Sequence, residues 1–199
     1  MRELGILITQ DPLTCTHLAA PNLVRTKKFL CALASGPSVI STDFIDTCVK
    51  EGELQEADEF LLKDAAKEKE FSVKLKDVVA RAKANKRSLL RRVPIYATKD
   101  VPNGPETYKA IVEANGGTFG VYTGKPTIKK VNPEDDEGPA EPVYLVTGLR
   151  PDEKLLWPKF TEMAIEGNMI PRIVDTEWLL DVALSQQQKW KESYLAAKK

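Results

Sequence analysis

Short apolar runs alternate with stretches of helical spacing along the chain. Three of these runs are bounded by Pro, Gly or Asp and are too short for helices: residues 5–8, 16–20 and 38–41. The spacing predicts one helix from Arg25 to about Ala34 and another over residues 42–49, with Thr42 as its cap. Strands that alternate with helices predict an α/β fold, in which helices cover both sides of mostly parallel sheets.

The second half of the chain repeats the pattern of the first. Three pairs of segments match in residue type: 173–181 with 39–46, 143–146 with 16–19, and 117–121 with 5–8. The first pair matches in order, through a strand end, a threonine, an acidic residue, an aromatic residue and an aliphatic residue. The folding unit is therefore duplicated.

The second copy has elements that the first copy lacks. A strand over residues 93–97 and a helix over residues 105–115 precede residue 117, whereas only four residues precede residue 5. One strand and one helix, about 20 residues by usual element lengths, are expected to be absent from the first copy. Either the chain is truncated there or another chain supplies them.

These patterns predict a first repeat over residues 1–52, a linker with a helix over residues 53–90, and a second repeat over residues 91–199. The basic end of the linker helix is interpreted as a solvated face, with a nuclear import signal as the alternative. Residues 125–142 are interpreted as a mobile insertion without function, and the polar tail after Gln188 is expected to fray.

Composition excludes several classes of function. Because 29 Lys and Arg balance 29 Asp and Glu, the net charge is zero and gives no general electrostatic attraction for nucleic acid. Three cysteines without a CxxC pair favour a reducing compartment and no metal site. His17 is the only histidine, and the lack of a long apolar run favours a soluble intracellular protein without a membrane partner. We expect neither an enzyme nor a cofactor.

The start of the first predicted helix is unusually basic. Arg25, Lys27 and Lys28 surround Thr26, the expected N-cap, and apolar residues follow. A helix start carries unpaired N–H groups and a positive dipole end, so cations there are unfavourable unless an anion binds. The sequence predicts an anion site, and solvated charges on an ordinary surface helix are the alternative.

Thr16-His17-Leu18, then the segment from Arg25 to Leu33, then Val39-Ile40-Ser41-Thr42, resemble a BRCT repeat. Two repeats with a helical linker resemble a tandem BRCT pair, in which each repeat is a parallel four-stranded sheet flanked by helices. The resemblance is greatest to the C-terminal phosphohistone-binding pair of fungal genome-stability scaffolds. The chain also resembles, less closely, the animal mediator of DNA damage checkpoint and the PAX transactivation-domain interacting protein.

This resemblance implies roles for the basic helix start. In the family, the lysine matching Lys28 binds a phosphoserine phosphate together with a Ser or Thr and a Gly from the first strand. Thr26 joins it at the helix cap, and the arginine matching Arg25 contacts the third residue after the phosphoserine, often through a free carboxylate. Since the Ser/Thr-Gly pair belongs to the strand that is absent, this chain alone is expected to bind weakly unless a fragment is supplied.

The resemblance also implies a groove between the repeats. Lys27, Thr176 and Leu180 are its candidate residues, whereas Trp178 is expected to pack in a core. The second repeat is not expected to bind phosphate, because Thr98-Lys99 stands where a Ser/Thr-Gly pair would be needed.

The expected function is that of a nuclear scaffold module in the DNA damage response. It would read phosphoserine peptides, with the tail of a damage-marked core histone ending in Ser-Gln plus two residues as the expected partner. Other repair proteins are further partners, and DNA is contacted only through chromatin. The alternative is a docking module that does not require phosphate, and direct DNA binding ranks last because the net charge is zero.

Overall fold

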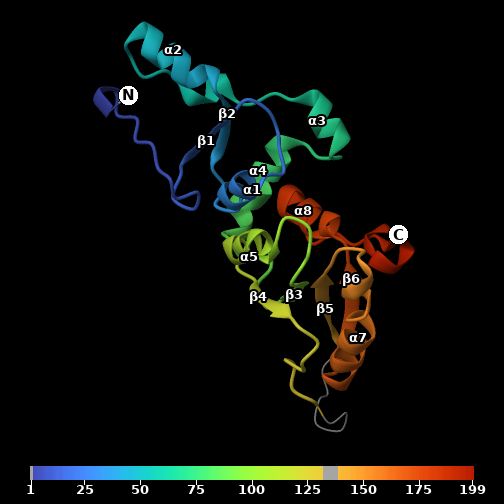
Figure 1. Cartoon of the computed structure of the whole chain (residues 1–199). Coiled ribbons are helices and arrows are strands. Elements are labelled where there is room, and N and C mark those ends of the chain that lie inside the picture. Colours follow the sequence, from blue (N-terminus) through green and yellow to red (C-terminus); the bar gives the residue numbers. More distant parts are fainter. Residues whose placement is uncertain (1, 132–138) are drawn as a thin grey trace. The chain divides into compact units, whose positions relative to one another are not determined.

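The computed structural model describes residues 2–131 and 139–199 and divides the chain into two compact units (Figure 1). Unit 1 consists of Met1–Arg87 with Ala183–Gln187, and unit 2 of Ser88–Val182 with Gln188–Lys199. Both units are α/β with parallel strands, as predicted. Within the described ranges, no helix is long and apolar enough to cross a membrane.

Unit 1 is built on a pair of parallel strands, β1 (His17–Ala20) and β2 (Ser38–Ser41). They are connected through helix α1 (Lys27–Leu33), as parallel strands require a crossover. The other edge of β2 meets residues 61–62, because Leu62 N–H donates to the Val39 carbonyl (3.0 Å). The sheet of unit 1 therefore has two strands among the described residues, instead of the four expected of a complete repeat.

The predicted strand over residues 5–8 is wrong. A 3₁₀ turn (Arg2–Leu4) leads into irregular chain, in which Ile6 packs against the α2 core and Leu7 is 81% exposed. In unit 2 the matching strand pairs only with β3, and unit 1 has no counterpart of β3 within the part that the structure describes. Residues 5–8 have no neighbouring strand to bond, so their apolar pattern does not produce one.

Four further helical segments complete unit 1. They are α2 (Asp43–Glu51), a 3₁₀ turn (Ala57–Phe60), α3 (Ala65–Glu70) and the linker helix α4 (Leu75–Asn85). Phe44 and Cys48 of α2 pack with Ile40, and the Phe60 ring meets Phe44 edge-on at 5.6 Å. Thr42 makes no capping bond because its own backbone is helical, and Ser41 Oγ instead accepts from Asp43 N–H (3.2 Å).

Unit 2 has a complete parallel sheet in the order β4-β3-β5-β6. Its elements are β3 (Pro94–Thr98), α5 (Pro105–Ala114), β4 (Thr118–Tyr122), β5 (Glu141–Val146), α6 (Pro151–Lys154), α7 (Trp157–Glu166), β6 (Met169–Val174) and most of α8 (Thr176–Ser185), whose residues 183–185 belong to unit 1. The predicted strands and helices of the second copy are confirmed to within a few residues.

Helices cover both faces of this sheet. Successive residues of β5 point to opposite faces, so their contacts show which helix packs on each face. Val143 and Leu145 pack with Phe160 of α7, whereas Tyr144 stacks on Trp178 of α8 with ring centroids 3.9 Å apart. Trp178 is 2% exposed, which confirms its predicted place in a core.

Part of the predicted insertion over residues 125–142 packs on unit 2. Ile128 contacts the α7 core, Lys130 pairs with Glu166 (2.7 Å), and β5 already begins at Glu141. The acidic centre of the insertion, with Asp135-Asp136, lies outside the described residues. The interpretation of the whole stretch as a mobile insertion is therefore wrong for residues 125–131 and 141–142.

The C-terminal tail docks on unit 2, contrary to the expected fraying. Two 3₁₀ turns (Glu192–Tyr194 and Ala196–Lys198) bury Tyr194 and Ala196, and Leu195 bridges to Val174. The Tyr194 hydroxyl donates to Asp181 Oδ2 (2.7 Å), and burial together with this bond raises the pKa of Tyr194. Two buried residues anchor a segment whose composition is otherwise polar. The hydrophobic periodicity of the sequence could therefore not reveal that the tail packs on unit 2.

Candidate functional site

Helix α1 begins at the residues predicted to bind an anion. Thr26 is its N-cap, with an extended backbone, and its Oγ1 accepts from Phe29 N–H (3.4 Å) while its carbonyl accepts from Leu30 N–H (3.0 Å). The threonine hydroxyl keeps its own proton for a further acceptor. The N–H groups of Lys27 and Lys28 have no acceptor within the helix, as at every helix start.

The body of α1 is buried and its basic tip is exposed. The five residues from Phe29 to Leu33 are at most 5% exposed, whereas Thr26, Lys27 and Lys28 are exposed. Neither lysine forms an ion pair with any residue that the structure describes. Burial raises the pKa of the Cys31 thiol, and nearby Lys27 partly opposes that rise. The apolar body of α1 anchors the helix, so its positive end is held at the surface of unit 1.

Arg25 lies beside this tip against an aromatic ring from the linker region. Its guanidinium carbon is 4.8 Å from the centroid of the Phe71 ring, and Lys67 Nζ is 5.5 Å from the same centroid. A half-buried cation on a ring face has a restricted orientation. Unit 1 thus holds four cations, Arg25, Lys27, Lys28 and Lys67, on or near the start of α1.

Asp64 fixes the loop that leads into α1. Its Oδ2 accepts from Leu23 N–H (3.0 Å) and its Oδ1 accepts from Lys67 N–H (3.0 Å), so one carboxylate caps α3 and ties down the chain before Arg25. The bonds from Lys67 N–H and Leu23 N–H lower the pKa of the Asp64 carboxyl. This carboxylate therefore fixes the loop that precedes Arg25.

The six predicted site residues are divided between the two units. Thr176 and Leu180 are half-buried residues of α8 in unit 2, whereas Arg25, Thr26, Lys27 and Lys28 all belong to unit 1. Within unit 1, the structure brings together the four basic-tip residues. Among the described residues, no group of three or more His, Cys, Asp or Glu side chains could hold a metal ion.

Comparison with known proteins identifies the architecture. A model of the BRCT domain of Regulator of Ty1 transposition protein 107 matches residues 1–62. BRCT-containing protein 1 of Schizosaccharomyces pombe is 32% identical over 192 residues, which are 94% of this chain and 21% of that protein. The crystal structure of S. pombe Brc1 BRCT5-BRCT6 is similar with a TM-score of 0.73 at 30% identity, over 94% of this chain and 85% of that one. The chain belongs to the BRCT family, as a tandem pair of repeats.

A more distant BRCT structure shares the fold. The complex of Rtt107p with a phosphorylated histone is similar with a TM-score of 0.67 at 18% identity, over 98% of this chain and 82% of that one. The likeness to fungal scaffolds that the residues suggested is thereby confirmed. The chain spans only 21% of the fission yeast protein, so it corresponds to one module of that relative.

In the second BRCT repeat a buried glutamate side chain lies at the ends of β3 and β5. Glu153, 2% exposed, accepts through Oε1 from the Thr98 hydroxyl and from Gly148 N–H (2.8 Å). A Cβ on Gly148 would lie 2.4 Å from Glu153 Oε2, so a larger residue there would require the glutamate side chain to shift. These two donors therefore already have an acceptor within unit 2.

Sequence reasoning missed three residues that shape these sites. Asp64 had a detectable signal, since Asp before a helical run is a typical N-cap, but its second bond to Leu23 spans 41 positions. Phe71 lies in the predicted linker over residues 53–90, to which no site role was assigned. Glu153 gave no local signal, because its contact with Thr98 depends on tertiary structure.

Proposed function

We propose that the first BRCT repeat binds a phosphoserine peptide at the start of α1. The observation that carries this proposal is the exposed tip of a buried helix, where Lys27 and Lys28 have no ion-pair partner among the described residues and the Thr26 hydroxyl has a proton to donate. Phosphoserine carries a charge near −2 and three acceptor oxygens at neutral pH, which suit an ammonium group and helix-start N–H groups. Lys28 is the principal phosphate ligand in this proposal.

Arg25 recognises the peptide beyond the phosphoserine. Its planar guanidinium matches a carboxylate in a two-bond geometry, and the Phe71 ring restricts its orientation before the peptide arrives. We assign to Arg25 the third residue after the phosphoserine, through the free C-terminal carboxylate. Lys27, Thr176 and Leu180 are proposed as groove residues around the peptide.

The proposed partner is the phosphorylated C-terminal tail of a core histone. The complex of Rtt107p with a phosphorylated histone supports this choice, since Rtt107p shares the tandem BRCT fold. The module would act in the nucleus as part of a scaffold for the DNA damage response, beside other repair proteins. The net charge of zero supports contact with DNA only through chromatin.

Energetics set the size of the expected effect. A hydrogen bond to a charged group contributes about 1.5–3 kcal/mol net, so one phosphate held by Lys28 and Thr26 corresponds to a preference of tenfold or more for the phosphorylated peptide. The carboxylate contact at Arg25 is expected to contribute a similar factor. Both factors are measurable even when the absolute affinity is weak.

Calorimetric titration of the full chain with four peptides tests this function. The peptides end in Ser-Gln followed by two residues and combine a phosphorylated or unmodified serine with a free or amidated C-terminus. We expect the phosphorylated free acid to bind most tightly, with losses of about tenfold or more on removing the phosphate and several-fold on amidation. Equal affinity for phosphorylated and unmodified peptides would indicate docking without phosphate and end the proposal, whereas indifference to amidation would remove only the role of Arg25.

A further inference from the structure

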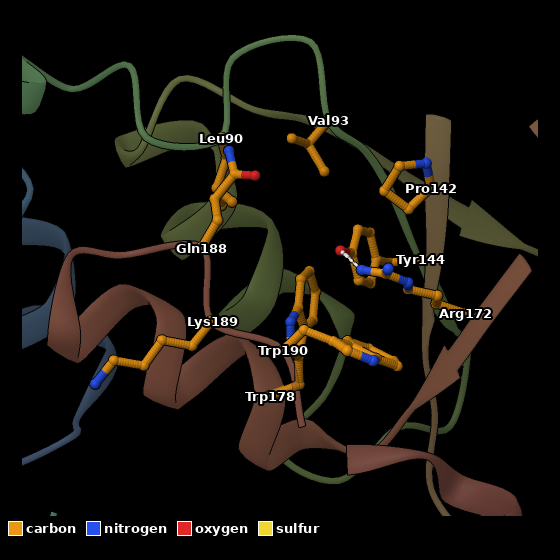
Figure 2. Close-up of a pocket in the computed structure, with 9 residues that line it drawn as sticks. All are labelled: Leu90, Val93, Pro142, Tyr144, Arg172, Trp178, Gln188, Lys189 and Trp190. Atoms are coloured by element: carbon orange, nitrogen blue, oxygen red, sulfur yellow. Dashed lines mark hydrogen bonds between the residues drawn. The ribbon is translucent and has the colours of Figure 1, made fainter. Parts of the chain in front are cut away.

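A small cavity of about 110 Å³ lies within unit 2 (Figure 2). It is lined by Leu90, Val93, Pro142, Tyr144, Arg172, Trp178, Gln188, Lys189 and Trp190. Strands β5 and β6, helix α8 and the docked tail each contribute to its wall. None of the nine lining residues is acidic, although the chain as a whole has equal numbers of acidic and basic residues.

Arg172 supplies the charge of this cavity. Its guanidinium carbon is 4.1 Å from the centroid of the Trp190 ring, and its Nη1 donates to the Tyr144 hydroxyl (2.7 Å). Figure 2 shows these side chains gathered on one side of the cavity, with the ammonium group of Lys189 directed away from them. Arg172 has no carboxylate partner within residues 2–131 and 139–199, and its hydrogen bond to Tyr144 leaves most of its five N–H groups for a ligand.

Tyr144, a neighbour of Arg172, is also a donor with capacity to spare. Its hydroxyl accepts from Arg172 and keeps its own proton, because burial raises the pKa of Tyr144 although Arg172 partly opposes that rise. Trp178 contributes the wall of the cavity rather than a donor, because its indole Nε1 is buried out of reach of a ligand.

The wall thus combines an arginine and a tyrosine hydroxyl with apolar surface. Gln188 contributes little more, since its amide nitrogen already donates to the Leu89 carbonyl (2.6 Å). An acceptor-only group satisfies such a set of donors, and a planar carboxylate can accept two parallel N–H bonds from a guanidinium. Val93 and Pro142, which are partly exposed, offer apolar surface for the group attached to that carboxylate.

We propose that this cavity is a second peptide-binding site, which takes a carboxylate next to an apolar side chain from an acidic peptide segment of a protein partner. Arg172 binds the carboxylate, the Tyr144 hydroxyl donates to it, and Val93 and Pro142 contact the neighbouring apolar side chain. The site needs neither Lys28 nor a phosphate, so it is independent of the function proposed for the first repeat.

The three tryptophans give a direct readout. All of them, Trp157, Trp178 and Trp190, belong to unit 2, but only Trp178 and Trp190 line the cavity, whereas the Trp157 indole N–H donates to Thr147 Oγ1 (3.3 Å) elsewhere. Titration of the ¹⁵N-labelled full chain with acetyl-Leu-Glu-Leu-amide should move the indole signals of Trp178 and Trp190 and leave that of Trp157 in place. Acetyl-Leu-Gln-Leu-amide is the neutral control, and acetyl-Leu-Gln-Leu with a free C-terminus separates a terminal from a side-chain carboxylate.

We expect at least one acidic probe to bind about tenfold or more tightly than the neutral one. Arg172→Met should abolish this preference, whereas Lys189→Met, which also changes a lining residue, should leave it within about twofold because that ammonium group points away. Tyr144→Phe, which keeps the ring stack and loses only the hydroxyl, should weaken acidic probes several-fold.

Three results would overturn this site. They are equal binding of acidic and neutral probes, an unchanged preference in Arg172→Met, and no movement of the Trp178 and Trp190 signals at probe concentrations up to about 10 mM. If Arg172→Met displaces the Trp157 signal and so proves misfolded, Tyr144→Phe decides alone, and unaltered acidic binding in that variant contradicts the proposal.

Discussion

The guanidinium carbon of Arg25 lies 4.8 Å from the centroid of the Phe71 ring, across 46 positions of sequence. Arg25 precedes α1, and Phe71 ends the short helix α3. The residue proposed to read the peptide terminus is therefore oriented by the linker region, not by its own helix. This arrangement would separate the two proposed recognition events, that of phosphate at α1 and that of carboxylate at Arg25.

Phe71→Leu should weaken carboxylate recognition without affecting phosphate recognition. A partly exposed cation–π contact contributes about 0.5–1 kcal/mol, so the affinity ratio between free and amidated peptides should fall by about two- to fivefold. The ratio between phosphorylated and unmodified peptides should stay constant, since the cations described over the Phe71 ring are Arg25 and Lys67, not Lys28. Calorimetry measures both ratios, and an unaltered ratio for amidation would show that the ring does not orient Arg25.

Gly36→Ala should destabilise unit 1 more than Gly52→Ala does. Both glycines have left-handed backbones, with φ of 71° and 70°, which costs an alanine about 1–2 kcal/mol. Only at Gly36 would a Cβ meet backbone, at 2.9 Å from Lys83 N in α4, whereas Gly52 has open space around it. We expect an extra cost of about 1–3 kcal/mol at Gly36, measured by hydrogen exchange of buried amides in α1. Equal losses in the two variants would mean that the approach of α4 to Gly36 is looser than described.

Asp64→Asn should make the stability of unit 1 less dependent on acidic pH. The folded-state pKa of Asp64 is lowered, so its contribution is complete above the ordinary value and is lost as pH falls through the lower folded value. Between about pH 5 and about pH 3 the unmodified chain should therefore lose more stability than Asp64→Asn. Thermal melts followed by circular dichroism at both pH values provide the comparison, and parallel losses in the two proteins would count against the Leu23 and Lys67 bonds.

Glu153 should stabilise the second repeat through its hydrogen bonds. Glu153→Ala would leave the Thr98 hydroxyl and Gly148 N–H without their buried acceptor, at a cost of about 1–3 kcal/mol, whereas Glu153→Gln keeps an acceptor oxygen and should cost less. Because all three tryptophans lie in unit 2, urea unfolding followed by tryptophan fluorescence reports on this repeat alone. Equal stability of the Glu153→Ala and Glu153→Gln variants would contradict the proposal that the hydrogen bonds of Glu153 stabilise the repeat.

The duplicated α/β pattern was predictable because each strand and helix carries a local signal. Residues 173–181 and 39–46 share a pattern strong enough to place α8 and α2. The failure at residues 5–8 has a physical cause: an apolar run becomes a strand only when a neighbour accepts its hydrogen bonds, and sequence periodicity does not report the neighbour.

The candidate site was predictable only where it is local. Thr26, Lys27 and Lys28 share one helical turn, so capping and charge rules identified them. Phe71, Asp64 and Glu153 act through contacts that join distant segments, and the Arg172 cavity gathers residues from β5, β6, α8 and the tail. Short-range sequence patterns contain no information on contacts between residues that are far apart in the sequence.

The phosphate role of Lys28 is tested most directly by comparing Lys28→Met with Lys63→Met, a matched change at another exposed lysine of unit 1. The quantity to measure is the ratio of affinities for the phosphorylated and unmodified peptides with free C-termini. We predict that this ratio falls about tenfold or more in Lys28→Met and is unchanged in Lys63→Met. The same ratio in Lys28→Met as in the unmodified chain would contradict the account.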